Sequence, residues 1–193
     1  MKKGMINMLS ANKILSEMTR GHITIMPMDP QNLGPISYDM SIENRLIEIP
    51  ATYQKVDDGH PLYPKHNVID TKDESKHFQK EVIIPEDGII LFPGILYLAT
   101  TKEEIWSDTY VPCVSGRSSF ARAGIEVHHT SFFANPGHRF KWILEISVTV
   151  PIKIYPDSKI CQLYFEDVTG SLNGFEYHGK YLDNNSDYGF ISE

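Results

Sequence analysis

The chain has few cysteines and no long hydrophobic run, and both shortages narrow its class. Only two of its 193 residues are cysteines, Cys113 and Cys161, and no C-x-x-C pair occurs. This predicts two buried free thiols in a reducing compartment, without a disulfide. No window approaches the roughly 18 apolar residues of a membrane span, and no apolar signal segment follows Lys2 and Lys3. We therefore expect a cytoplasmic protein that does not contact membranes.

Positive charge is also scarce. The chain has 18 Lys and Arg against 25 Asp and Glu, a formal net charge of −7. This argues against a nucleic-acid or anionic-membrane binder, because such proteins hold anions with a broad basic surface. It does not exclude a nucleotide, since a small polyanion needs only a few local cations. The length and 41% hydrophobic content predict a single domain, residues 1–193, with its own core.

Short apolar runs separated by turn signals dominate the second half of the chain. Eight such runs follow residue 80, and no strand–helix–strand rhythm occurs among them. This pattern predicts an all-β sandwich, barrel or jelly roll. Further strands are predicted at 22–27 and 38–49, with Asp39 in a structural hydrogen bond rather than in catalysis. A helix is predicted at 10–20, capped by Ser10 and stopped by Gly21.

Two segments depart from the strand pattern. Residues 50–80 are polar and rich in turn signals, which predicts a long surface excursion. Its histidines, His60, His66 and His77, fit no metal-ligand spacing. Residues 176–193 are rich in Gly, Asn and Asp, and we expect a tail that stays mobile until a ligand orders it.

The residues from 116 to 124 could form a small site for a polyanion. Gly116 lets the backbone approach a ligand, and Arg117 and Arg122 supply planar guanidinium groups that match phosphate oxygens. Ser118 and Ser119 can add hydroxyl and amide donors at the start of a short helical turn. By itself, however, a Gly-Arg-Ser segment is more often an ordinary loop.

A carboxylate, Glu145, lies within the apolar run W-I-L-E-I. Strand alternation places it on the same face as Ile143. A carboxylate in a strand is more often half of an ion pair than a catalyst, but a partly apolar pocket is also what general acid–base chemistry requires. For the other candidates we favour structural roles: packing or surface roles for His128 and His129, and core positions for Phe132 and Trp142.

Several motifs follow one another in a distinctive order: L-S-A-N-K-I-L, G-P-I-S-Y-D-M, G-R-S-S-F-A-R-x-G, V-H-x-T, N-P-G, I-L-E, K-I-C-Q-L-Y-F-E and Y-H-G-K-Y-L-D-N. Together they resemble those of the dCTP deaminase family, relatives of the trimeric dUTPases. The resemblance covers most of the chain and is weakest between about residues 50 and 81. It implies a dUTPase-like distorted β-barrel or jelly roll with a short N-terminal helix and a mobile C-terminal tail. It also implies a homotrimer with sites between subunits.

The resemblance implies a role for each matching residue. Glu145 corresponds to the general base and acid, while Ser118, Arg122 and the backbone carbonyl of Ser131 correspond to groups that hold the water and the intermediate. The expected nucleotide contacts are Arg117 and Ser119 for the triphosphate, Asn135 for the 3′-hydroxyl, the backbone of Ile143, Leu144 and Glu145 for the base, and Tyr177, Lys180 and Asn184 from the closing tail. Mg²⁺ would arrive with the triphosphate, so no metal site in the protein is expected.

The signature of the zinc-dependent nucleobase deaminases is missing. They carry H-x-E followed by P-C-x-x-C. Here no His is followed by x-Glu, and the single Pro-Cys pair, which ends at Cys113, has no second Cys nearby. The sequence therefore favours zinc-independent hydrolysis of dCTP to dUTP and ammonia, which would supply dUMP for thymidylate synthesis.

Four residues depart from the family pattern: Asn135 for Asp, Asn184 for Gln, Phe140 for Gly and Ser131 for Ala. The Asp at position 135 helps to orient the water that attacks the α-phosphate in relatives that hydrolyse dUTP. Its loss should weaken hydrolysis more than deamination. A dUTPase or bifunctional dCTP deaminase/dUTPase, which releases dUMP and pyrophosphate, stays an alternative. So do a preference for a modified cytosine nucleotide and a nucleotide-binding trimer without catalysis.

Overall fold

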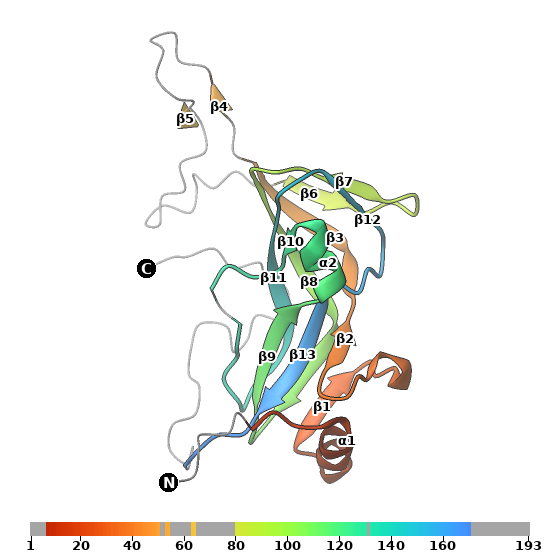
Figure 1. Ribbon diagram of the computed structural model, residues 1–193, viewed down its shortest axis with the longest axis vertical. Coiled ribbons are helices and arrows are strands. Elements are labelled where there is room, and N and C mark those ends of the chain that lie inside the picture. Colours follow the sequence, from red (N-terminus) through yellow and green to blue (C-terminus); the bar gives the residue numbers. More distant parts are fainter. Residues whose placement is uncertain (1–6, 51–52, 55–62, 65–79, 131, 171–193) are drawn as a thin grey trace.

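The computed structural model describes residues 7–50, 53–54, 63–64, 80–130 and 132–170 (Figure 1). The predicted tail at 176–193 and most of the predicted excursion at 50–80 lie outside these residues. The elements are, in chain order, α1 (Ala11–Arg20), β1 (Ile23–Met26), the 3-10 helix η1 (Pro30–Asn32), β2 (Tyr38–Met40), β3 (Ile42–Pro50), β4 (Tyr53–Gln54), β5 (Tyr63–Pro64), β6 (Lys80–Ile83), β7 (Ile89–Leu91), β8 (Ile95–Ser107), β9 (Val111–Gly116), α2 (Ser118–Ala123), β10 (Ile125–Glu126), β11 (Arg139–Val148), β12 (Ile152–Ile154) and β13 (Cys161–Glu166).

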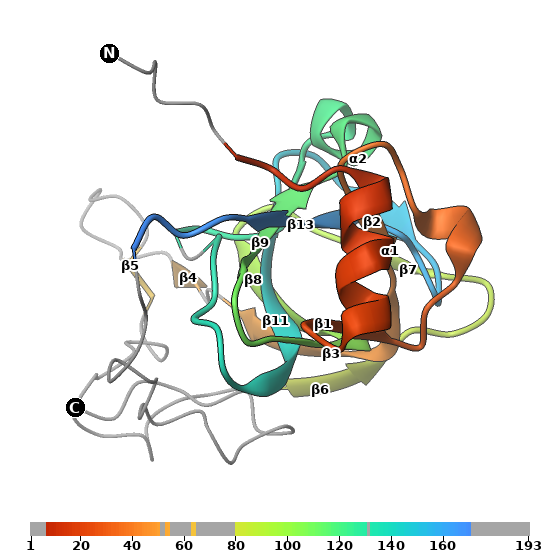
Figure 2. The same ribbon diagram turned by 90° about the horizontal axis from the view of Figure 1, so that it is seen from below.

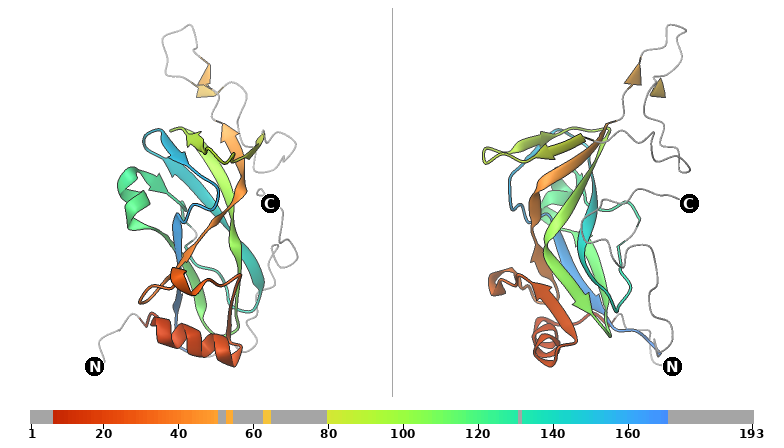
Figure 3. Two further views of the ribbon diagram at one scale, coloured as in Figure 1. Left: turned by 90° about the vertical axis from the view of Figure 1, so that its right-hand side faces the viewer. Right: turned by 180° about the vertical axis from the view of Figure 1, so that it is seen from behind.

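Antiparallel sheets build the fold. The largest has the order β10-β11-β8-β3-β6, with β1 paired to the far part of β8. A three-stranded sheet, β2-β13-β9, faces it (Figure 3), and β12-β7 and β4-β5 form separate pairs. Seen from below, the strands surround the core and α1 lies across one end (Figure 2). The predicted all-β fold with a short N-terminal helix is confirmed.

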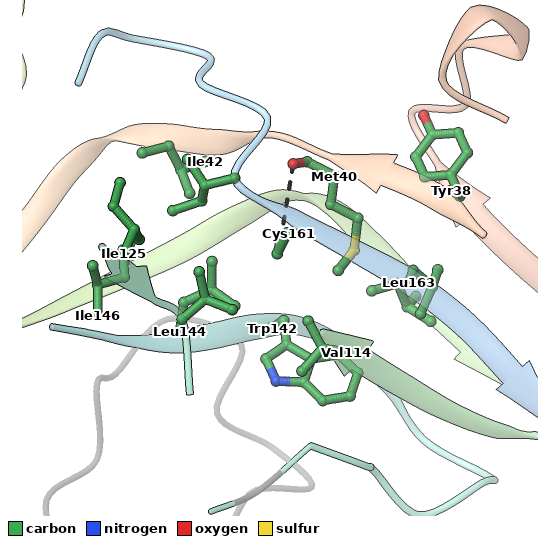
Figure 4. Packing of buried hydrophobic residues seen from close by; sticks show 14 of the residues in the cluster. Tyr38, Met40, Ile42, Val114, Ile125, Trp142, Leu144, Ile146, Cys161 and Leu163 are labelled. Carbon is green, nitrogen blue, oxygen red and sulfur yellow. Dashed lines mark hydrogen bonds between the residues drawn. The ribbon is translucent and has the colours of Figure 1, made fainter. Parts of the chain in front are cut away.

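The core lies between the two larger sheets. Alternate residues of β11, among them Leu144 and Ile146, are fully buried and belong to one core cluster with Met40 and Leu163 of the three-stranded sheet (Figure 4). Burying an aliphatic side chain of this size contributes roughly 1.5–3 kcal/mol. The intervening residues of β11 therefore face outwards, which sets the direction of the candidate catalytic carboxylate.

The predicted cysteine state is confirmed, since both thiols are free and buried. Cys161 donates weakly to the Met40 carbonyl, at 3.9 Å. Burial raises the pKa of the Cys113 thiol to about 12, with a smaller contribution from the nearby Glu166 carboxylate. Both cysteines therefore act as small apolar groups of the interior rather than as nucleophiles.

The eight predicted runs after residue 80 correspond to β6 through β13, but the predicted strand at 38–49 is two strands. The chain leaves the three-stranded sheet after Met40 and enters the larger sheet at Ile42. At this crossing the Ser41 N–H donates to the buried Glu103 carboxylate at 3.0 Å, and the Ser41 carbonyl accepts from Lys102 N–H at 2.8 Å. These bonds satisfy the N–H and C=O of Ser41, which would otherwise have no hydrogen-bond partner at the crossing.

Local sequence signals set the start and end of α1 and the end of α2. The Ser10 hydroxyl accepts the Lys13 N–H at the start of α1, and Gly21 ends that helix at φ 81°. Gly124 ends α2 at φ 97°. Among the described residues no helix is long and apolar enough to cross a membrane.

The two helix-ending glycines provide a matched stability test. At Gly21 a Cβ would meet nothing within 4 Å, whereas at Gly124 it would collide with Thr149 Oγ1. We expect Gly21→Ala to cost about 1 kcal/mol for the left-handed backbone alone and Gly124→Ala about 2–4 kcal/mol, because the collision adds to it. Urea unfolding of both variants measures the difference. Equal decreases in the free energy of unfolding would show that the Thr149 side chain moves aside without cost.

Candidate active site

Glu145 points outwards from β11 and is held by its neighbours. Ile143 and Glu145 are half-buried on the outer face, while Leu144 between them is buried, so the predicted alternation is confirmed. Glu145 Oε2 accepts the His129 N–H at 3.0 Å, and the Glu145 N–H donates to the Val127 carbonyl at 3.1 Å. The loop after β10 is thus bound to β11 through both the side chain and the backbone of Glu145.

The same strand presents peptide groups beside this carboxylate. The Glu145 N–H points to Val127 and away from β8, and antiparallel geometry turns the peptide groups of Ile143 to that same edge. The named strand β10 ends at Glu126, before it reaches Ile143. The expected backbone contact of Leu144 with the base is not supported, because the same alternation turns its N–H and C=O towards β8, and its side chain lies in the core. A sheet edge of this kind offers N–H and C=O groups suited to the polar edge of a pyrimidine.

The predicted polyanion residues lie at the end of β9 and on α2. The helix begins at Ser118, as the sequence predicted, with Arg117 at its N-cap. Ser118, Ser119 and Arg122 are exposed. In the part of the chain that the structure describes, their side chains have no hydrogen-bond or ion-pair partner, which leaves these donors accessible.

Arg117, by contrast, is firmly placed. Its Nη1 donates to the Lys159 carbonyl at 2.9 Å and its Nη2 lies 3.1 Å from Asp39 Oδ2. The other Asp39 oxygen accepts from Gln162 Nε2 at 2.8 Å. The structural hydrogen bond predicted for Asp39 is therefore confirmed, and its ion pair is with a residue of the candidate site. No described hydrogen bond joins this group of residues to Glu145.

Asn135 is exposed and follows a segment that runs along β9. The Phe132 carbonyl accepts the Val114 N–H at 2.7 Å, and the Ala134 N–H donates to the Pro112 carbonyl at 2.9 Å. Three residues further on, burial lowers the pKa of His138, and a hydrogen bond with the backbone of Asn135 raises it by a smaller amount. These contacts anchor the backbone on both sides of the Asn135 side chain.

Phe140, one of the four residues expected to depart from the family pattern, has a packing role. Its ring stacks on His138, with ring centroids 4.9 Å apart, and meets Trp142 edge-on at 5.3 Å. Trp142 is buried, as predicted. The departure at position 140 thus fills space beside the core, and the aromatic row is favourable in both pair geometries.

The prediction of Phe132 as a core residue is wrong. Its side chain is 42% exposed and meets Phe133, 52% exposed, at a centroid distance of 5.3 Å. The reason is that the segment is fixed to β9 by its backbone, which leaves the side chain free to turn outwards. His128 is half-buried with its ring 6.5 Å from that of Phe132, and His129 is exposed, in keeping with the packing and surface roles predicted for them.

Several predicted residues cannot be placed. Ser131, Tyr177, Lys180 and Asn184 lie outside the described residues, as do His60, His66 and His77. Within the described ranges, no three or more His, Cys, Asp or Glu side chains form a group that could hold a metal ion.

Comparison with known proteins identifies the family. The family model for dCTP deaminase-like proteins matches residues 8–168. The chain belongs to the dCTP deaminase-like family. It is 36% identical over 176 residues to a protein of Clostridium beijerinckii named "dCTP deaminase, dUMP-forming", with 91% of each chain covered. It is 32% identical over 185 residues to one of Rhodopirellula baltica named "dCTP deaminase", which covers 96% of this chain and 84% of the other.

The family fold agrees with a solved structure. The 2′-deoxycytidine 5′-triphosphate deaminase of Agrobacterium tumefaciens matches with a TM-score of 0.61 at 19% sequence identity. The match covers 84% of this chain and 49% of that longer chain. At this identity it supports the dUTPase-like fold that the motifs predicted.

Two contacts of the site were not visible in the sequence. The His129 N–H that binds Glu145 is a backbone group, and no residue type signals it. Gln162 reaches Asp39 because β13 pairs with β2 in a register that sets these two residues opposite each other. The only hint was the position of Asp39 between two buried residues of a strand.

Proposed function

We propose that this protein is a zinc-independent dCTP deaminase that converts dCTP and water to dUTP and ammonia, with Glu145 as the proton carrier. One observation carries the proposal: in a chain of the dCTP deaminase-like family, a carboxylate is fixed on an outward strand face beside an edge of peptide groups. The backbone edge at Ile143 reads the cytosine. Glu145 then lies next to the reacting carbon.

The proposed reaction replaces the C4 amine of the cytosine with oxygen. Glu145 takes a proton from a water molecule while the water oxygen attacks C4. Glu145 then passes that proton to ring N3. A second proton moves from the new hydroxyl through Glu145 to the amine, the C4–N bond breaks and ammonia leaves a C4 carbonyl. Ser118, Arg122 and the Ser131 carbonyl hold the water and the tetrahedral intermediate. Such proton transfer contributes typically about 10²–10⁴-fold in rate.

The rest of the nucleotide binds around this centre. Arg117 and Ser119 hold the triphosphate, which Mg²⁺ accompanies as part of the substrate. Asn135 contacts the 3′-hydroxyl. Residues of the tail close over the nucleotide: Tyr177, Lys180 and Asn184.

The proposal includes a homotrimer with sites between subunits. Its support is that Ser118, Ser119 and Arg122 are exposed and unpaired within the described residues, so a neighbouring subunit can use them. We expect light scattering of the purified protein to give about three times the chain mass of 22.0 kDa. A monomer that deaminates dCTP at full rate would contradict this assembly.

A second candidate, the bifunctional reaction, has its own support. The proteins of Clostridium beijerinckii and Cytophaga hutchinsonii, 36% and 35% identical to this chain, are both named "dCTP deaminase, dUMP-forming". Hydrolysis of the dUTP formed would add pyrophosphate release to the deamination. The neutral Asn135 opposes it, because it lacks the charge that helps orient water at the α-phosphate.

Glu145→Gln tests the catalytic role directly. The amide has nearly the same shape and keeps an oxygen for the His129 N–H, but it cannot carry a proton. We expect kcat to fall by about 10²–10⁴-fold, with dCTP binding and the melting temperature nearly unchanged. The matched control Glu104→Gln removes a surface carboxylate that pairs with Arg139 and should retain full activity. Unchanged turnover in Glu145→Gln would remove Glu145 from its role.

Product analysis with Asn135→Asp separates the two candidates. Purified protein is incubated with dCTP and Mg²⁺, and ammonia, pyrophosphate, dUTP and dUMP are measured. We expect the natural chain to release ammonia well ahead of pyrophosphate, and Asn135→Asp to raise pyrophosphate release relative to ammonia. Equal release of both products by the natural chain would make it bifunctional despite Asn135, and no turnover of dCTP would refute the deaminase.

A further inference from the structure

Arg117 is fixed at both its backbone and its side chain. Its N–H donates to the Ile160 carbonyl at 3.0 Å, its Nη1 to the Lys159 carbonyl at 2.9 Å, and its Nη2 lies 3.1 Å from Asp39 Oδ2. Long cationic side chains at a surface normally lose considerable rotamer entropy when they bind a ligand. Here the guanidinium plane is set before any ligand arrives.

Asp39 is itself held by the sheet. It lies in β2 between the buried residues Tyr38 and Met40, so its side chain must face outwards. It pairs in register with Gln162 of β13, whose Nε2 donates to Asp39 Oδ1 at 2.8 Å. The carboxylate thus has one oxygen on Gln162 and the other on Arg117. Only 20% of the Asp39 side chain and 32% of the Arg117 side chain are exposed, so solvent screens the pair only partly.

We propose that Asp39 is a positioning residue for nucleotide binding: with Gln162 it fixes the Arg117 guanidinium in the direction that receives the triphosphate. The inference rests on the proposed function, in which Arg117 contacts phosphate. A guanidinium has five N–H donors, and the contacts to Lys159 and Asp39 occupy two of them. The remaining donors can form a fork for phosphate oxygens.

The same ion pair also allows the opposite effect, and the test below distinguishes the two. A carboxylate beside an anion site repels phosphate, so Asp39 could compete with the ligand for Arg117 rather than orient the side chain for it. The geometry favours orientation because Asp39 bonds one end of the guanidinium and is itself tied to Gln162. Preorganisation of this kind strengthens binding by removing the cost of ordering a side chain.

A double-mutant cycle measures whether Asp39 acts through Arg117. The variants are Asp39→Asn, Arg117→Ala and the pair, each in the Glu145→Gln background, in which bound dCTP is not consumed. Calorimetry with Mg²⁺ gives Kd for dCTP and for dCMP, which lacks the outer phosphates. Asp108→Asn is the matched control, since Asp108 pairs with His22 before the start of β9, whereas Arg117 follows its end.

We expect Asp39→Asn to weaken dCTP binding roughly tenfold, as for the loss of one oriented charged contact, and to leave dCMP binding within about twofold. Added to Arg117→Ala, it should have little further effect, because residues that act through one another are not additive. Asp108→Asn should change neither Kd.

Three results would overturn the positioning role: additive losses in the double variant, equal weakening for dCTP and dCMP, or tighter dCTP binding in Asp39→Asn. A failure of the proposed function looks different. If the protein with natural Glu145 does not turn over dCTP, the proposed reaction is wrong. If Arg117→Ala leaves the affinity for dCTP intact, the proposed contact between Arg117 and the triphosphate is wrong. Neither conclusion depends on the effect of Asp39→Asn.

Discussion

A hydrogen bond to a buried carboxylate holds the chain where it crosses from the three-stranded sheet to the larger sheet. Ser41 belongs to neither β2 nor β3, and its N–H donates to the carboxylate of Glu103, which is almost fully buried. Burial raises the pKa of this carboxyl, and the bond from Ser41 works in the other direction. An apolar residue at position 103 would leave the Ser41 N–H without its acceptor, at a cost of about 1–3 kcal/mol. The crossing also separates the two functional groups of residues, since β2 carries Asp39 and the larger sheet carries Glu145.

Much of the fold could be predicted because its signals are local. The caps of α1 at Ser10 and Gly21 depend on residues within one helical turn, and the eight strands after residue 80 are short apolar runs between turn residues. The division at Ser41 could not be predicted, because the alternation continues through it without a break. The carboxylate that holds Ser41 at the division belongs to Glu103, which is 62 positions away in the sequence.

The candidate site shows the same limit. The outward direction of Glu145 follows from the two-residue period of a strand, so Ile143 and Glu145 share a face as predicted. The hydrogen bond from the His129 N–H to Glu145 depends on the path of a loop, and the hydrogen bond from Gln162 to Asp39 depends on strand register. Residue types reveal neither. Phe132 was misplaced for a related reason: hydrophobicity predicts burial, but a segment anchored through its backbone can leave an aromatic side chain in water.

The net negative charge of the chain explains why an ordered Arg117 guanidinium would matter for nucleotide binding. A protein with a net charge of −7 repels a triphosphate at long range, although salt screens that repulsion beyond a distance of about 8–10 Å. Binding must therefore come from a few cations at short range, and an ordered guanidinium gains more per contact than a flexible one. In the proposed site the neutral Asn135, at the 3′-hydroxyl, adds no further negative charge near the nucleotide. The proposal that the reaction ends at dUTP therefore agrees with two effects expected of Asn135, weaker hydrolysis and less repulsion of the nucleotide.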